Sequence, residues 1–214
     1  MVKLSPSVLT SDFLTLKNVL KEFEESGVDM LHLDVMDGIF VPNISFGVPV
    51  IKSIKAHTNI PLDVHLMIDR PHRYIKDFAA VSDWLGFHYE AGSDVAETLK
   101  EIRALGCKSC LTIKPKTEPE EIFEFLPLCD MVLVMSVEPG FGGQKFMPNS
   151  LPKIKALKAE AMRQGLNIEI EIDGGINAET APLAVEAGAT VLVAGNYVFS
   201  SDNIPETVKQ IRSL

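Results

Sequence analysis

The sequence is poor in cysteine and has no long apolar run. Its three cysteines, Cys107, Cys110 and Cys129, are an odd number and too few for a disulfide framework. Cys107 and Cys110 form a CxxC pair, but no second CxxC completes a zinc site, so we expect reduced, buried thiols. No segment approaches the roughly 20 apolar residues of a membrane span, and no N-terminal apolar stretch is long enough for a signal peptide. We therefore expect a cytoplasmic protein without a membrane partner.

Positive charge is also in short supply. Lys and Arg together number 20 against 29 Asp and Glu, which gives a formal net charge of −9. This balance argues against nucleic acid or an anionic membrane as the main partner. It is compatible with a small phosphorylated substrate, because a few backbone N–H groups and a metal ion can hold one phosphate locally.

Short apolar, β-branched runs alternate with longer amphipathic stretches along the chain. We expect strands at Lys3–Ser7, Met30–Val35, Leu62–Met67, Trp84–His88, Ser109–Ile113, Met131–Ser136, Ile168–Asp173 and Val191–Gly195. We expect helices between them, for example at Leu14–Ser26, Val50–His57, Ala96–Leu105, Leu151–Gln164 and Thr180–Ala187. Several of the connecting stretches end in a glycine just before the next strand, as helices often do: Gly27, Gly106, Gly165 and Gly188.

Eight β-then-α units predict an α/β fold in one domain, residues 1–214. Eight is also the number of parallel strands at which such a sheet closes into a (β/α)8 TIM barrel. A doubly wound open sheet is the main rival, but no GxGxxG motif follows the first strand. In a barrel the active site lies at the C-terminal ends of the strands, so we expect the functional residues among the polar residues at those ends.

Four polar residues end three of the predicted strands. His32 and Asp34 are two residues apart, so both side chains point to the same face of their strand. His65 lies near the end of the third strand and Asp173 at the end of the seventh. Each residue could be satisfied separately by its own neighbours, but burying four unpaired polar groups would be expensive. We therefore expect them to converge in a shared site for a divalent transition metal.

Glycine-rich loops follow the last three strands, at Gly140–Gly143, at Gly174–Gly175 and at Gly195–Asn196. Glycine lets backbone N–H groups approach an anion closely, and these barrel loops often bind phosphate. Such loops are also common as plain tight turns. His88 ends the fourth strand, where its spacing fits a pocket-lining residue and a strand cap equally well.

The chain resembles the ribulose-phosphate 3-epimerase family from its first predicted strand to its last. The segments that carry the resemblance are SPSVLTSDF, HLDVMDGIFVPN, FGVPV, LDVHLMI, VMSVEPGFGGQKF, EIEIDGGIN and VLVAGNYVF. The resemblance implies an isomerase of the pentose phosphate pathway that interconverts D-ribulose 5-phosphate and D-xylulose 5-phosphate at C3. It also implies a homo-oligomer, either a dimer or a hexamer.

The resemblance assigns roles to particular residues. It implies one divalent ion per subunit (Zn²⁺, Fe²⁺, Mn²⁺ or Co²⁺), bound by His32, Asp34, His65 and Asp173. Asp34 would accept a proton and Asp173 would donate one. Substrate and phosphate would contact Ser7, His65, Gly140, Phe141, Gly142, Gly143, Asp173, Gly174, Gly175, Gly195 and Asn196, and the pocket would be lined by Met36, Met67 and Met135. Position 196 is Asn where the family commonly has serine, so a hydroxyl contact to phosphate is expected to be lost.

The implied chemistry explains why such residues are needed. Loss of the C3 proton from a ketose requires a polarised C2 carbonyl, and a metal can stabilise the resulting enediolate. Epimerisation then needs a base on one face of the intermediate and an acid on the other.

Other functions fit the sequence less well. The nearest is 3-epimerisation of a six-carbon ketose phosphate such as allulose 6-phosphate. Decarboxylases on related barrels carry an Asp-x-Lys-x-x-Asp motif, but the residue two after Asp34 is Met36. A barrel that only binds a phosphosugar would leave two carboxylates without a task.

Overall fold

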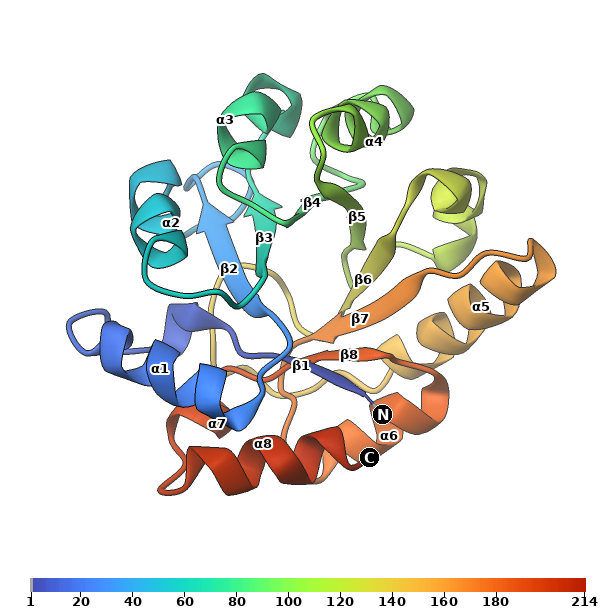
Figure 1. The fold of residues 1–214 in the computed structure, drawn as a ribbon. Helices are drawn as coiled ribbons and strands as arrows, with labels where there is room; N and C mark the ends of the chain where they lie inside the picture. Colours follow the sequence, from blue (N-terminus) through green and yellow to red (C-terminus); the bar gives the residue numbers. More distant parts are fainter. Residues whose placement is uncertain (1) are drawn as a thin grey trace.

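The computed structural model describes residues 2–214, which form a ring of parallel strands surrounded by helices (Figure 1). Within these residues, eight strands are present: β1 (Lys3–Ser5), β2 (Leu31–Met36), β3 (Leu62–Met67), β4 (Trp84–His88), β5 (Lys108–Ile113), β6 (Met131–Met135), β7 (Glu169–Asp173) and β8 (Val191–Val193). All eight lie at or within three residues of the predicted positions. The predicted (β/α)8 TIM barrel is therefore confirmed.

The helices alternate with the strands. The α-helices are α1 (Leu16–Ser26), α2 (Val48–Lys55), α3 (Ile75–Ala79), α4 (Val95–Ala104), α5 (Ser150–Arg163), α6 (Thr180–Ala187), α7 (Asn196–Phe199) and α8 (Ile204–Arg212). Three 3-10 helices are found in residues 2–214: η1 (Val8–Thr10), η2 (Pro71–Arg73) and η3 (Pro119–Leu128). Within this same range, no helix has the length and apolar character needed to cross a membrane.

The strands pair in the order β1-β8-β7-β6-β5-β4-β3-β2, and every pair is parallel. The ring closes just beyond the end of β1, where Ser7 forms a parallel bridge with His32. The His32 N–H donates to the Pro6 carbonyl over 3.1 Å at this seam. The closure brings Ser7 next to the β2 residues that were predicted to form the site.

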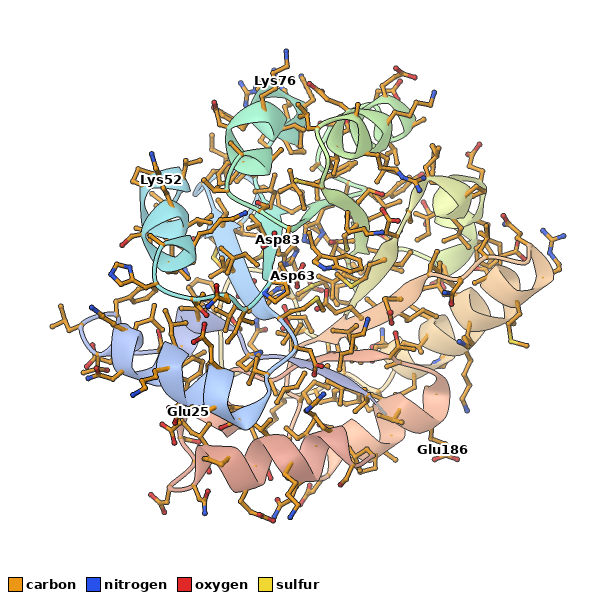
Figure 2. All side chains as sticks on the ribbon, in the orientation of Figure 1. Glu25, Lys52, Asp63, Lys76, Asp83 and Glu186 are labelled. Carbon is orange, nitrogen blue, oxygen red and sulfur yellow. The ribbon has the colours of Figure 1, made fainter. Side chains whose placement is uncertain are left out.

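The two faces of each strand have different environments. Leu31, Leu33 and Val35 of β2 are buried against the surrounding helices, in the main hydrophobic core. The alternate residues His32 and Asp34 point to the barrel interior, as the period of two predicts. Figure 2 shows Asp63 of β3 inside the ring, whereas the labelled side chains of the outer helices lie at the periphery: Glu25, Lys52, Lys76 and Glu186.

A second apolar cluster fills part of the barrel interior. It consists of Met30, Cys110, Met131, Leu133, Met135, Val137 and Val191. The three cysteines are free and buried, which agrees with the interpretation of the CxxC pair as reduced thiols. Burial raises the pKa of the Cys129 thiol to about 12, so this group is not a reactive thiolate.

Helix ends follow the local sequence signals. Gly27 after α1 and Gly188 after α6 adopt left-handed backbone conformations with φ of 75° and 115°, which glycine tolerates best. The predicted helix start at Leu14 is two residues early, since α1 begins at Leu16 and Leu14 is 96% exposed. Between β5 and β6 the chain forms the 3-10 helix η3, and Pro127 inside it lacks the N–H that an α-helix would use.

Candidate active site

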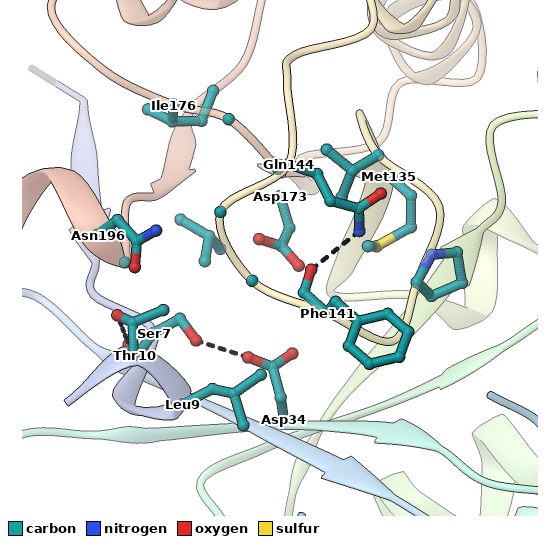
Figure 3. A pocket seen from close by; sticks show the side chains of 18 of the residues that line it. Ser7, Leu9, Thr10, Asp34, Met135, Phe141, Gln144, Asp173, Ile176 and Asn196 are labelled. Atoms are coloured by element: carbon teal, nitrogen blue, oxygen red, sulfur yellow. Dashed lines mark hydrogen bonds between the residues drawn. The ribbon is translucent and has the colours of Figure 1, made fainter. Parts of the chain in front are cut away.

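The four predicted metal ligands lie together at the C-terminal end of the barrel. His32 and Asp34 come from β2, His65 from β3 and Asp173 from β7, and one ligand atom from each lies within 4.8 Å of the others. The strand register explains half of this arrangement, because Asp34 is paired directly with His65. Barrel closure explains the other half by bringing β7 across the axis. Figure 3 shows Asp34 and Asp173 reaching into the pocket from opposite sides.

The near nitrogens of the two imidazoles and one carboxylate oxygen form a tight group. His32 Nε2 and His65 Nδ1 each lie 3.3 Å from Asp34 Oδ1, and the two nitrogens are 3.3 Å apart. Asp173 Oδ2 is 4.0 Å from His32 Nε2. All of these atoms belong to side chains that are at least four-fifths buried. The group can therefore surround one small cation without large movements.

The far nitrogens of both imidazoles are occupied inside the protein. His32 Nδ1 lies 2.6 Å from Asp63 Oδ2, and His65 Nε2 lies 2.9 Å from Nε2 of His88. A histidine that binds a metal usually engages its other ring nitrogen in this way, which fixes the ring orientation. His32 Nε2 and His65 Nδ1 are thus the nitrogens that face the site.

The two aspartates have different electrostatic environments. Burial alone would raise the pKa of Asp34, but His32 and His65 outweigh burial and hold it below its usual range. Ser7 Oγ also donates to Asp34 Oδ2 over 2.6 Å. Burial, together with the charge of Asp34, raises the pKa of Asp173 to about 7. Asp34 is therefore ionised at neutral pH, while Asp173 is close to half protonated.

The charge on His32 reflects the same competition. Burial would lower the pKa of His32, but the carboxylates of Asp34 and Asp63 raise it well above its usual range. In the protein without a cation, the His32 proton therefore offsets the surrounding negative charge. Two imidazole nitrogens and two carboxylates form a donor set that suits a divalent transition metal, so the residues present fit the metal that the sequence predicts.

A pocket of about 450 Å³ opens above this group. Met36, Met67 and Met135 line it and are each at least 96% buried, as the resemblance implies. The other predicted residues that line the pocket are Ser7, Asp34, Gly140, Phe141, Gly142, Gly143, Asp173, Gly174, Gly175, Gly195 and Asn196. His32 and His65 lie beneath its floor and are fully buried.

Two of the pocket glycines are required by packing. A Cβ added at Gly174 would lie 2.6 Å from Val137, and one added at Gly175 would lie 2.5 Å from the Phe146 backbone nitrogen. Both residues also have positive φ, of 125° and 64°. The backbone at the end of β7 therefore approaches the β6–α5 loop closely, and this approach shapes one wall of the pocket.

The site contains polar residues to which we assigned no role from the sequence. Asp63 accepts from His32, and fully buried Glu171 lies near both of them. Asp63 precedes His65 by two residues and Glu171 precedes Asp173 by two, so the period of two places both on the interior face. His88 is not among the residues that line the pocket; it ends β4 and is fully buried behind His65.

Comparison with known proteins agrees with this geometry. The ribulose-phosphate 3 epimerase family matches residues 3–199. Ribulose-phosphate 3-epimerase of Bacillus subtilis is 45% identical over 99% of both chains. The enzyme of the same name from Methanocaldococcus jannaschii is 42% identical over 99% of this chain and 90% of its own, and that from Synechocystis is 42% identical over 99% and 94%.

Solved structures of lower identity share the barrel. A 3-hexulose-6-phosphate synthase superposes with a TM-score of 0.71 at 17% identity, covering 99% of this chain and 98% of that one. An orotidine 5′-phosphate decarboxylase from Pyrococcus horikoshii gives 0.67 at 17% identity, covering 99% and 100%. Likeness at this identity shows the fold alone. The full-length relatives are more specific, and with the matching family they show that this chain belongs to the ribulose-phosphate 3-epimerase family.

Proposed function

We propose that the protein interconverts D-ribulose 5-phosphate and D-xylulose 5-phosphate by moving a proton at C3. The observation that carries the proposal is the pair Asp34 and Asp173. The two carboxylates reach into one pocket from opposite sides, and their pKa values are shifted in opposite directions. A base and an acid that face each other across a planar intermediate are what inversion at a carbon atom requires.

Each residue of the pair has a defined task. Ionised Asp34 takes the C3 proton from one face, and protonated Asp173 returns a proton from the opposite face. The reverse reaction uses the two groups in exchanged roles. Ser7 holds Asp34 in place through its 2.6 Å hydrogen bond, which directs the other carboxylate oxygen toward the histidines. A divalent cation held by His32, Asp34, His65 and Asp173 would supply the positive charge that stabilises the developing enediolate.

The surrounding pocket supports this chemistry in two ways. The buried thioethers of Met36, Met67 and Met135 exclude water and offer no proton donor that would compete with Asp173. On the other side, Gly143, Gly175 and Asn196 surround a space suited to the substrate phosphate. Because Asn196 replaces the serine common in the family, we propose that its backbone N–H and side-chain amide bind this phosphate.

Three finer points belong to the proposal. The mixed nitrogen and oxygen donors favour Zn²⁺, Fe²⁺, Mn²⁺ or Co²⁺ over Ca²⁺ or Mg²⁺, which prefer oxygen ligands. The free, buried cysteines suit a reducing compartment, and we propose the cytoplasm. We also propose a homo-oligomer, a dimer or hexamer, as the family resemblance implies.

The test is proton NMR of ribulose 5-phosphate in D₂O with metal-loaded protein. We expect xylulose 5-phosphate to form with deuterium at C3, and we expect Asp173→Asn to abolish this conversion while keeping the fold. Allulose 6-phosphate in a parallel reaction tests the six-carbon alternative. Absence of turnover of the pentose phosphate, with metal binding demonstrated, would refute the proposal.

A further inference from the structure

A third imidazole lies behind the two that face the site. His88 at the end of β4 is fully buried, and its Nε2 lies 2.9 Å from Nε2 of His65. Two ring nitrogens at this distance form a hydrogen bond only if one carries a proton and the other does not. The direction of this bond therefore decides which nitrogen of His65 keeps a lone pair for the site.

Glu90 determines the direction of the bond. His88 Nδ1 lies 3.3 Å from Glu90 Oε2, and neither atom has another partner among residues 2–214. The two atoms are close, but the hydrogen bond between them is not formed in this structure. Burying both atoms without a partner is unfavourable, and a hydrogen bond between them would satisfy both. An ionised carboxylate only accepts, so the pairing places a proton on His88 Nδ1.

The carboxylate of Glu90 is itself held firmly. Its Oε1 accepts from the Lys114 backbone N–H over 2.9 Å and from the Thr117 hydroxyl. The buried ammonium of Lys153 donates to the Thr117 carbonyl, which anchors the same loop. Burial would raise the pKa of Glu90, but His88, Thr117 and Lys114 lower it to about 2. Glu90 is thus a fixed, ionised acceptor.

Because ionised Glu90 can only accept from His88, it also decides which ring donates in the hydrogen bond between His65 and His88. With its proton on Nδ1, neutral His88 presents Nε2 as an acceptor, and His65 must donate from its own Nε2. The lone pair of His65 then lies on Nδ1. In the metal-free protein, protonated His32 Nε2 donates to it over 3.3 Å, so Nδ1 needs no proton of its own beside Asp34 Oδ1, which is also 3.3 Å away. The Phe40 ring, whose centroid is 4.8 Å from that of His88, limits rotation of the His88 ring.

We propose that His88 and Glu90 are positioning residues that fix His65 as its Nε2–H tautomer and so prepare Nδ1 to bind the cation. The inference rests on the proposed metal site and deepens it. In this arrangement each of the two histidines has a carboxylate on the side away from the site, which fixes the proton on its far ring nitrogen. Asp63 contacts His32 directly over 2.6 Å, whereas Glu90 acts on His65 through an intervening imidazole.

The test compares four variants with the wild type. His88→Leu removes the acceptor, His88→Gln keeps one at a similar reach, and Glu90→Gln removes the anchoring charge. Thr112→Val is the matched control, because Thr112 is fully buried beside His88 on β5 and its hydroxyl has no partner in the described residues. The first measurement is the Kd for Co²⁺ by direct titration. The second is ¹⁵N NMR of the histidine rings, in metal-free and Zn²⁺-loaded protein.

We expect His88→Leu to weaken Co²⁺ binding by about 10- to 100-fold, as losses of outer-shell support typically do. His88→Gln should restore most of the affinity, Glu90→Gln should fall between, and Thr112→Val should match the wild type. The wild-type spectrum should show the His65 proton on Nε2 even without metal. A proton on His65 Nδ1 in metal-free wild-type protein, or unchanged Co²⁺ affinity in folded His88→Leu, would overturn the inference.

The ring spectrum does not depend on turnover. If the wild-type protein lacks epimerase activity but shows the His65 proton on Nε2, the proposed function is refuted. The positioning of His65 by His88 and Glu90 is then still supported. If His88→Leu does not fold, the wild-type tautomer and the Glu90→Gln affinity still decide the question.

Discussion

Replacing Asp173 by asparagine should stabilise the metal-free protein at pH 8 while abolishing its activity. Burial and the neighbouring charge of Asp34 raise the pKa of Asp173 well above its ordinary value, to about 7. Ionisation of Asp173 therefore destabilises the folded protein when no cation is bound. Asparagine has nearly the same shape as the protonated acid and never carries the charge.

The sign of the effect follows from proton linkage. Between the unfolded pKa, about 4, and the folded pKa, the native state binds the extra proton, so stability falls as pH rises through this window. At pH 5 the unfolded chain is already mostly ionised, whereas native Asp173 ionises only near pH 7. Two pH units at 1.36 kcal/mol each give a stabilisation by Asp173→Asn that is about 2–3 kcal/mol larger at pH 8 than at pH 5. For a chain of this length this corresponds to about 5–10 °C in Tm.

The assay is thermal and urea unfolding in a chelating buffer at both pH values. Glu186→Gln on the outer helix α6 is the control, because it removes an exposed carboxylate outside the barrel interior (Figure 2). We expect this control to show the same small effect at both pH values. A stabilisation by Asp173→Asn that does not grow between pH 5 and pH 8 would refute the assignment of a raised pKa to Asp173.

Three further results are expected. Ser7→Ala removes the 2.6 Å hydrogen bond to Asp34 and should lower kcat/KM about 10- to 100-fold in a coupled epimerase assay, with little change in Tm. Gly174→Ala places a methyl group 2.6 Å from Val137 and should cost about 2–4 kcal/mol in urea unfolding, whereas Gly47→Ala, with nothing within 4 Å, should cost under about 1 kcal/mol. Adding Zn²⁺ at 100 times its Kd should stabilise the metal-free protein by about 2.7 kcal/mol. Titrations should show tighter binding at pH 8 than at pH 6, because the proton on His32 must leave before the ring can bind the cation.

The period of two along each strand made much of the site predictable from sequence. It places His32 and Asp34 on one face of β2, and the eightfold repeat of β-then-α units predicts the closed barrel that brings Asp173 to them. The same period of two places Asp63 on the interior face of β3 with His65, and Glu171 on the interior face of β7 with Asp173. Their roles depend on what faces them, which is set by the β2–β3 register for Asp63 and by the curvature of the barrel for Glu171.

Other features could not be predicted because they arise between segments distant in the chain. His88 lies behind His65 because β3 and β4 are neighbours with a particular stagger, and a single sequence does not give this stagger. The loop between β5 and η3 holds Glu90, through the Lys114 N–H and the Thr117 hydroxyl.

The difference in pKa between Asp34 and Asp173 comes in part from their neighbours. Asp34 lies 3.3 Å from protonated His32 on its own strand and is hydrogen-bonded to Ser7, so positive charge and a donor stabilise its ionised form. Asp173 sits in register between Met135 of β6 and Val193 of β8, which offer neither charge nor a hydrogen bond from their side chains. Two identical carboxyl groups therefore have pKa values shifted in opposite directions, which suits them to the proposed roles of base and acid. A hydrogen-bond donor at Met135 or Val193 should therefore lower the pKa of Asp173 toward that of Asp34, and the proposed acid would lose the property that separates it from the base.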